Sequence, residues 1–142
     1  MFMQIPSWRP DAAAQITGDG VSGLVRFWQL RRGVLVEAKI AGLPREGFFA
    51  FHIHEGPDCG GAGFSDSGGH YHPAGTLHPD HAGDLPPLLS YGGRAWMAVM
   101  TNRFRVRDIV GRTVIIHSGT DDFHTQPSGN PGEKLACGVI QA

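Results

Sequence analysis

Apolar and polar positions alternate along much of this chain with the two-residue period of β-strands. The clearest alternation covers residues 34–40, where a small or branched apolar residue occupies every second position. The turn signal Asp19-Gly20 separates the first two predicted strands and predicts a hairpin. The pattern shows no helix, coiled coil or internal repeat. The predicted strands cover residues 12–18, 23–30, 34–40, 48–54, 94–100, 113–117 and 135–140.

Two long polar stretches, residues 56–93 and 121–134, interrupt this pattern. Glycine, proline, histidine and aspartate dominate the first of them, and no periodicity holds for long. A loop of this length inside a compact domain is usually functional. Bound metal and a disulfide could order it in place of a local core. Short strands joined by turns and long loops predict an all-β sandwich or barrel.

The chain has 142 residues, of which 41% are hydrophobic, and a formal net charge of −1. This length predicts one domain over residues 1–142, with residues 1–10 as a loosely ordered N-terminal extension. Near-neutral charge argues against a nucleic-acid partner. No apolar run approaches the roughly 20 residues that a membrane helix needs, so no membrane partner is expected. Arg103, Arg105 and Arg107 are expected on one face of a short extended stretch, as a solvated outer face, with a basic nucleic-acid patch as the alternative.

The first ten residues lack the apolar core of a signal peptide. We therefore expect a cytoplasmic protein from the chain as written, with a processed periplasmic or secreted form as the alternative. The two cysteines, Cys59 and Cys137, allow either two buried thiols or one disulfide. A disulfide would close a loop of about 80 residues and stabilise the fold by about 4.5 kcal/mol in the chain-entropy model.

The histidines indicate a metal site. On the strand over residues 48–54, His52 and His54 share one face while Phe49, Phe51 and Ile53 share the other. Two imidazoles in this arrangement suit one metal ion, and a partly exposed polar face is the alternative. The strand over residues 113–117 ends in His117, and as a neighbouring strand it can place this histidine beside His52 and His54. Neutral imidazoles suit zinc and copper. All eight histidines lie between positions 52 and 124: His52, His54, His70, His72, His78, His81, His117 and His124.

The chain resembles the copper/zinc superoxide dismutases over residues 11–142. The resemblance implies an all-β, immunoglobulin-like Greek-key barrel or sandwich of about eight antiparallel strands with two long functional loops. Five motifs carry it: Phe-His-Ile-His-Glu at 51–55, Gly-Gly-His-Tyr-His-Pro at 68–73, His-Ala-Gly-Asp-Leu at 81–85, Gly-Arg-Thr-Val-Ile-Ile-His at 111–117 and Leu-Ala-Cys-Gly-Val-Ile at 135–140.

The resemblance also assigns roles to individual residues. It implies a copper ion held by His52, His54, His70 and His117, and a zinc ion held by His70, His78, His81 and Asp84. His70 would bridge the two metals and supply a catalytic proton. Asp121 would link His52 to His78 and fix their orientation. Cys59 and Cys137 fall on the family's disulfide positions.

The activity implied is oxidoreductase chemistry that converts superoxide to dioxygen and hydrogen peroxide, with copper and zinc as cofactors. Lys134 stands where the family usually has an arginine, so we expect a slower enzyme whose rate falls with salt. The alternative is a copper- or zinc-binding protein of the same fold with little activity. His72 and His124 are expected as surface or hydrogen-bonding residues. The oligomeric state stays open between a monomer and a homodimer.

Overall fold

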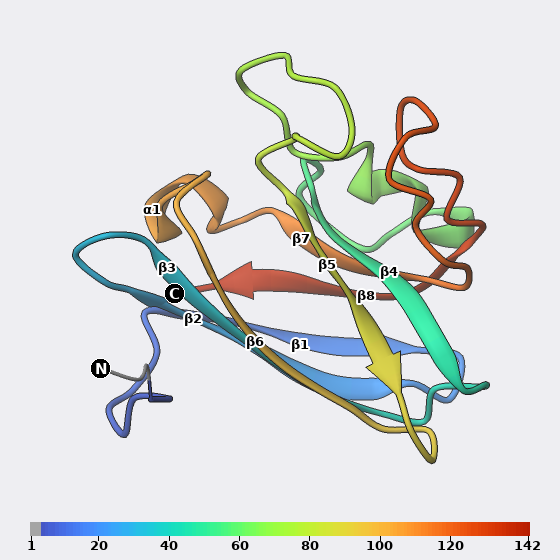
Figure 1. Ribbon diagram of the computed structural model, residues 1–142, viewed down its shortest axis with the longest axis horizontal. Coiled ribbons are helices and arrows are strands. Elements are labelled where there is room, and N and C mark those ends of the chain that lie inside the picture. Colours follow the sequence, from blue (N-terminus) through green and yellow to red (C-terminus); the bar gives the residue numbers. More distant parts are fainter. Residues whose placement is uncertain (1–3) are drawn as a thin grey trace.

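The computed structural model describes residues 4–142, which form an all-β protein of eight strands with two short helical segments (Figure 1). None of the helices in this part of the chain has the length and apolar character needed to span a bilayer. The strands are β1 (Ala12–Gly18), β2 (Ser22–Gln29), β3 (Val34–Ala41), β4 (Gly47–His54), β5 (Asp84–Ser90), β6 (Ala95–Thr101), β7 (Thr113–His117) and β8 (Lys134–Gln141). The helical segments are a 3-10 helix, η1 (Ala62–Ser67), and a one-turn α-helix, α1 (Val106–Ile109).

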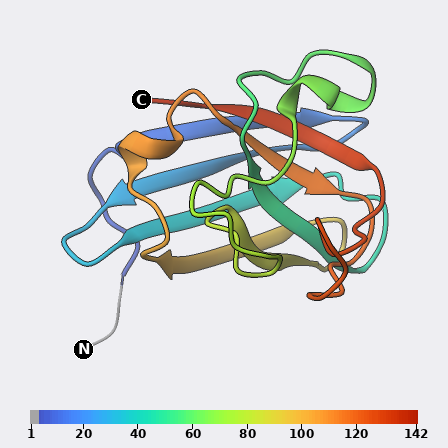
Figure 2. The same ribbon diagram turned by 90° about the horizontal axis from the view of Figure 1, so that it is seen from above.

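The strands form one antiparallel sheet in the order β5-β4-β7-β8-β1-β2-β3-β6. The chain crosses from β3 to β4 and from β6 to β7, so consecutive strands are not always neighbours, as in a Greek key. The sheet curls until its edge strands β5 and β6 contact each other, which nearly closes a barrel (Figures 1 and 2). The predicted all-β Greek-key fold is confirmed.

All seven predicted strands are present, and β1 and β7 have the predicted bounds. The eighth strand, β5, was missed because it lies inside the first polar stretch and contains Pro86 and Pro87. Proline cannot donate to a sheet ladder, but β5 is an edge strand, where proline is tolerated. The arginines at 103, 105 and 107 are exposed as expected, but the extended stretch predicted for them ends at Arg105 and is wrong beyond it. Residues 106–109 form α1, and the backbone N–H of Arg105 donates to the Asp108 carboxylate at 2.9 Å.

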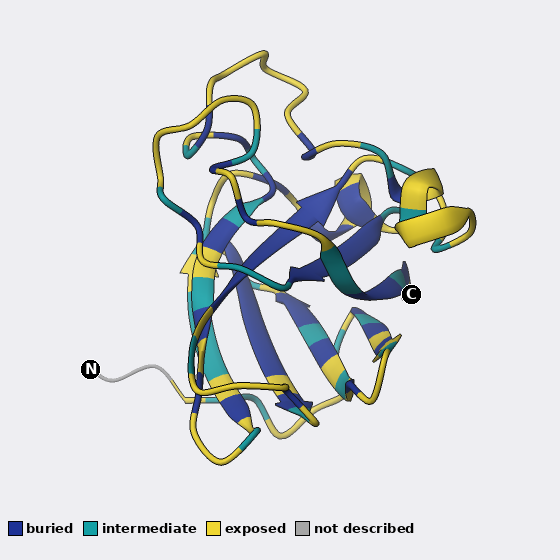
Figure 3. Cartoon of the chain, turned by 90° about the vertical axis from the view of Figure 1, so that its right-hand side faces the viewer, coloured by how far each residue is buried: buried dark blue, intermediate teal, exposed yellow. Residues whose placement is uncertain are grey.

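The core lies between the two halves of the curled sheet. On β4 the side chains of Phe49, Phe51 and Ile53 are fully buried in it, as predicted. On the opposite face of β4, Phe48 near the start of the strand is exposed, but His52 and His54 are buried because the long loops cover them. Figure 3 shows buried residues concentrated in the strands and exposed residues in the connecting loops. The two polar loops therefore add a second buried region outside the barrel.

The segment before β1 has no helix or strand over residues 4–11. The carbonyl of Trp8 accepts a hydrogen bond from Trp28 Nε1 at 3.0 Å, which places this segment against β2. Residues 1–3 lie outside the described part of the chain. The single domain over residues 1–142 and its loosely ordered extension therefore remain predictions.

A buried ion pair on the outer face of the sheet gives a stability prediction. Glu37 is 3% exposed and accepts hydrogen bonds from Arg26 Nε at 3.0 Å and Trp96 Nε1 at 2.9 Å. Burial raises the pKa of Glu37, but these hydrogen bonds and the Arg26 charge outweigh it and hold the pKa below its usual 4.5. The stabilisation is therefore present above about pH 4.5 and is lost as pH falls through the lowered pKa.

We expect Glu37→Gln to lower the free energy of unfolding at pH 7 by about 1–3 kcal/mol, since two donors lose a charged acceptor. The loss relative to the native protein should shrink as pH falls below about 4.5. Urea denaturation of the metal-free protein across this pH range measures both effects, with the exposed Asp19→Asn as control. A loss of the same size at every pH would contradict the ionic origin of the stabilisation.

Candidate metal centre

Strand pairing brings three histidines onto one face of the β4–β7 pair. In the antiparallel register, His52 pairs with Ile115 and His54 with Thr113, while His117 ends β7. A bridge between His54 and His70 attaches the first polar loop to the end of β4. The Tyr71 N–H extends this attachment by donating to the Ile53 carbonyl at 2.9 Å. Four histidines from three segments therefore meet at one place.

These residues form the four-histidine cluster: His52, His54, His70 and His117. One ring nitrogen from each lies within 4.8 Å of the others, and all four are buried. The Nε2 atoms of His54 and His117 are 3.3 Å apart. His54 Nδ1 contacts the Gly68 carbonyl at 2.8 Å, which leaves its Nε2 facing the cluster.

A second group surrounds Asp84, the first residue of β5. Pairing of β5 with β4 sets Asp84 opposite His52, so the missed strand is what positions this carboxylate. The Asp84 carboxylate lies 2.8 Å from His70 Nδ1, 3.0 Å from His78 Nδ1 and 3.4 Å from His81 Nδ1. His81 Nδ1 is also 3.3 Å from His70 Nδ1. We call His70, His78, His81 and Asp84 the carboxylate cluster; His70 belongs to both clusters.

Asp121 links the two clusters, because its carboxylate contacts one histidine of each. Its carboxylate lies 2.8 Å from His52 Nε2 and 2.7 Å from His78 Nε2. Burial raises the pKa of Asp121, but hydrogen bonds from both imidazoles and from the Phe123 N–H hold it well below the usual range. An ionised carboxylate only accepts, so both imidazoles donate from Nε2 and turn Nδ1 toward the clusters.

The donor atoms fit metal ions. His52 Nδ1 and His70 Nε2 are buried and have no hydrogen-bond partner in the protein, and the buried His78 Nδ1 makes no hydrogen bond although the Asp84 carboxylate lies 3.0 Å away. Burial lowers the pKa of His54 to about 2 and that of His117 to about 3, so both imidazoles are neutral at pH 7. Neutral nitrogens with free lone pairs are what a metal requires. Four imidazoles suit copper, and three imidazoles with a carboxylate suit zinc.

The four-histidine cluster opens to solvent through a cavity of about 460 Å³. Lys134, the first residue of β8, lines this mouth. Its Nζ donates to Ser67 Oγ at 2.8 Å and to the Gly68 carbonyl at 2.9 Å. Burial lowers the pKa of Lys134. The lysine is therefore held by the last residue of η1 and the residue that follows it, and its charge lies at the entrance.

A family model described as copper/zinc superoxide dismutase (SODC) matches residues 21–140, nearly the whole sheet and both clusters. The chain belongs to the copper/zinc superoxide dismutase family. A superoxide dismutase [Cu-Zn] 2 of Aquifex aeolicus is 33% identical, with 85% of this chain and 80% of the relative covered. A superoxide dismutase [Cu-Zn] of Caulobacter vibrioides is 34% identical, with 87% and 81% covered.

A solved structure is similar over nearly its whole length. The crystal structure of the clock protein EA4 gives a TM-score of 0.83 at 30% identity and covers 98% of this chain and 99% of that one. Copper and zinc are the cofactors of the copper/zinc superoxide dismutase family, and superoxide is its substrate. The four-histidine cluster can hold one such ion, and a second group, His52, His70, His78 and Asp84, shares three residues with the carboxylate cluster. His81 lies beside this second group, with its Nδ1 3.4 Å from the Asp84 carboxylate.

The disulfide expected from the family is present. Cys59 and Cys137 form a bond that links the first polar loop to β8, which excludes the alternative of two buried thiols. His72 and His124 lie outside both clusters. The His72 ring stacks on His81 with 4.6 Å between centroids, and the His124 side chain is 81% exposed. Both occupy the surface or hydrogen-bonding positions expected of them.

Two polar residues near the carboxylate cluster were missed. Gln126 exchanges two hydrogen bonds with the His78 backbone, at 2.9 and 2.7 Å. Arg103 donates to the carbonyls of Pro79 and His81. The alternating arginines predicted only a solvated face for Arg103, and Gln126 belongs to no pattern or motif, so no sequence signal marks either residue as a support of the cluster.

Proposed function

We propose that this protein is a superoxide dismutase that converts superoxide to dioxygen and hydrogen peroxide. The proposal places copper at His52, His54, His70 and His117, and zinc at His70, His78, His81 and Asp84. Its main support is His70, which faces both clusters and leaves a buried Nε2 without a partner. Copper, when bound, supplies one-electron exchange with superoxide, and zinc supplies a fixed charge that orders the loop.

The protein's own residues have separate roles in this proposal. His70 Nδ1 faces Asp84, so its Nε2 is the atom that takes up and releases a proton beside the mouth. Two superoxide ions need two protons to give dioxygen and hydrogen peroxide, and a proton held at this nitrogen is delivered to the product. Asp121 holds His52 and His78 in the tautomers that leave Nδ1 free.

Lys134 attracts the anionic substrate in this proposal. Its charge at the mouth raises the local concentration of superoxide, an effect that salt screens. Hydrogen bonds to Ser67 and Gly68 occupy the ammonium, so few donors remain for the substrate. An arginine has five donors in a rigid fork and can keep such contacts while it binds an anion. The lysine therefore steers superoxide but does not anchor it.

The dismutation rate of protein loaded with one copper and one zinc, at low and high salt, tests the proposal. We expect a fast rate that falls as salt is added. A rate no faster than that of a simple copper–imidazole complex, with both metals bound, would reject dismutation. It would favour the alternative, a metal-binding protein of the same fold with little activity.

Lys134→Arg is expected to raise the rate at low salt by about two- to tenfold, because arginine adds free donors to the same charge. Lys134→Ala should lower the rate about tenfold and flatten its salt dependence. Pulse radiolysis at several salt concentrations measures both, and Lys39→Arg, on the outer face of the sheet, is the matched control. No gain from Lys134→Arg would show that the lysine does not limit the rate.

A further inference from the structure

Residues 78–81, called here the zinc turn, lie in a segment without regular structure. Two histidines of the carboxylate cluster, His78 and His81, begin and end the turn, and residues 71–83 contain no helix or strand. The turn therefore depends on side chains from elsewhere to hold its backbone in place. Gln126, from the second polar loop, holds His78 on one side.

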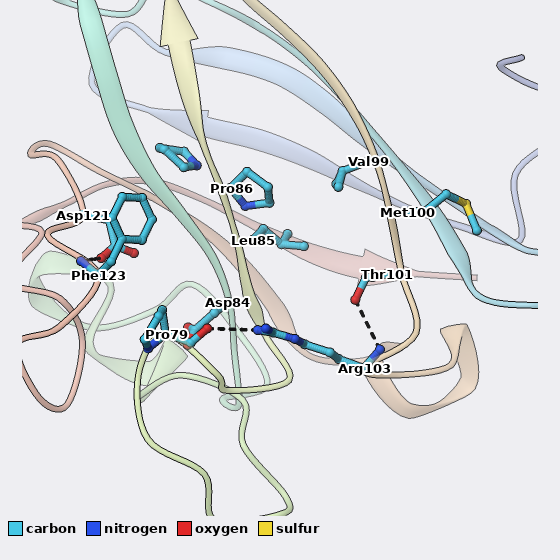
Figure 4. Close-up of a pocket in the computed structure, with 11 residues that line it drawn as sticks. Pro79, Asp84, Leu85, Pro86, Val99, Met100, Thr101, Arg103, Asp121 and Phe123 are labelled. Carbon is cyan, nitrogen blue, oxygen red and sulfur yellow. Dashed lines mark hydrogen bonds between the residues drawn. The ribbon is translucent and has the colours of Figure 1, made fainter. Parts of the chain in front are cut away.

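Arg103 holds the other side of the zinc turn. It follows β6, and its Nη1 donates to the Pro79 carbonyl at 2.9 Å and to the His81 carbonyl at 3.1 Å. Its Nη2 lies 3.5 Å from Asp80 Oδ1, but this aspartate side chain is 74% exposed, so the ion pair contributes little. Figure 4 shows Arg103 reaching from the end of the strand toward Pro79 and Asp84. The two carbonyl bonds are the important contacts.

Arg103 also lies at a cleft behind the carboxylate cluster. This cavity of about 380 Å³ lies between β5, β6 and the second polar loop, and Asp84 and Asp121 line it together with Arg103 (Figure 4). Among the described residues, none that lines this cleft also lines the mouth over the four-histidine cluster. Asp84 is therefore approached by a route separate from the mouth that Lys134 lines.

We propose that Arg103 is a positioning residue that controls how fast zinc leaves and enters through this cleft. The inference rests on the proposed function, which places zinc at the carboxylate cluster. With both carbonyl bonds in place, the zinc turn is held and His81 stays beside Asp84. Without them, residues 79–81 can move away, and the cleft loses a side chain that lines it together with Asp84. Copper, on the far side of His70, is not released faster.

The test is metal release from the copper- and zinc-loaded protein into excess chelator. Both metals are measured in the protein-free filtrate over time by mass spectrometry. We expect Arg103→Ala to release zinc about tenfold faster, the lower end of the effect of residues that support metal ligands. Copper release should stay within about twofold of the native rate, since outer supports act mainly on their own ligand.

Two further variants separate positioning from general loosening of the fold. Arg103→Lys keeps the charge and can reach one carbonyl, so zinc release should rise only about threefold. Arg105→Ala changes an exposed arginine that lines neither cavity, and it should leave zinc release unchanged. Rescue by lysine and selectivity for zinc are results that a loosened barrel would not produce.

The outcomes distinguish this inference from the proposed function. Zinc release from Arg103→Ala at the native rate, or equal acceleration of copper and zinc, would overturn the role of Arg103 and leave the proposed function intact. If the native protein takes up no stoichiometric zinc, the assignment of zinc and the role of Arg103 both fail. Fast zinc release that is selective over copper and restored in part by lysine would support the inference.

Discussion

Replacing Asp121 by asparagine is expected to lower the affinity for zinc, and the dismutation rate, by about 10- to 100-fold. The carboxylate accepts from His52 Nε2 and His78 Nε2 at once. An asparagine has one acceptor oxygen, so its amide nitrogen must face one of the two imidazoles. That imidazole must then move its proton to Nδ1, the atom that turns toward the metal. The substitution keeps the size of the side chain, removes its negative charge and reverses the proton on one imidazole.

Competition with a zinc chelator and the rate of the loaded enzyme measure this effect. Asp122→Asn is the matched control, because it makes the same chemical change one residue along the chain. The Asp122 carboxylate accepts from His124 and Thr125 in its own turn and touches neither cluster. We expect the control to retain zinc affinity and activity. Equal behaviour of the two variants would contradict the role assigned to Asp121.

Removal of the disulfide by the double change of Cys59 and Cys137 to serine is expected to lower the free energy of unfolding by about 4.5 kcal/mol. The bond spans 78 residues, and its loss returns that loop's freedom to the unfolded chain. It also releases the segment around η1. Ser67 and Gly68 hold Lys134, and Gly68 also contacts His54, so the mouth should loosen together with the fold.

Guanidinium chloride denaturation of the metal-free protein measures this loss without a contribution from metal binding. The native protein with its disulfide reduced is the control, and it should match the double variant. We expect the loaded double variant to keep its metals at moderate temperature but to show a lower rate and weaker salt dependence. A loss below about 1 kcal/mol would show that the reduced loop keeps its structure in the unfolded chain.

The strands were predictable because their signal is local. Alternation depends only on neighbouring residues, so the bounds of β1 and β7 could be predicted without knowledge of the fold. The same alternation predicted that His52 and His54 share a face. The strand β5 carries no such signal, since its two prolines disfavour a strand unless the position is an edge. Whether a strand lies at an edge is decided by its neighbours in space.

The candidate ligands were named from the sequence, but their arrangement depends on tertiary contacts. His70 meets His54 through a bridge between residues far apart in the chain, and Asp84 meets His52 through the pairing of β4 and β5. Asp121 could be given a role from the family resemblance, yet its two imidazole contacts require the second polar loop to fold over the first. These contacts decide which nitrogen of each histidine is free.

The sequence by itself determined the all-β class, the strand faces, the family and the residue types available for two metals, because these follow from local periodicity and from motif order. The tertiary structure decided where Lys134 binds, that Arg103 and Gln126 hold the zinc turn, and that a separate cleft reaches Asp84. Hydrogen bonds between loops depend on the distance between segments remote in sequence. No local pattern of residues encodes that distance.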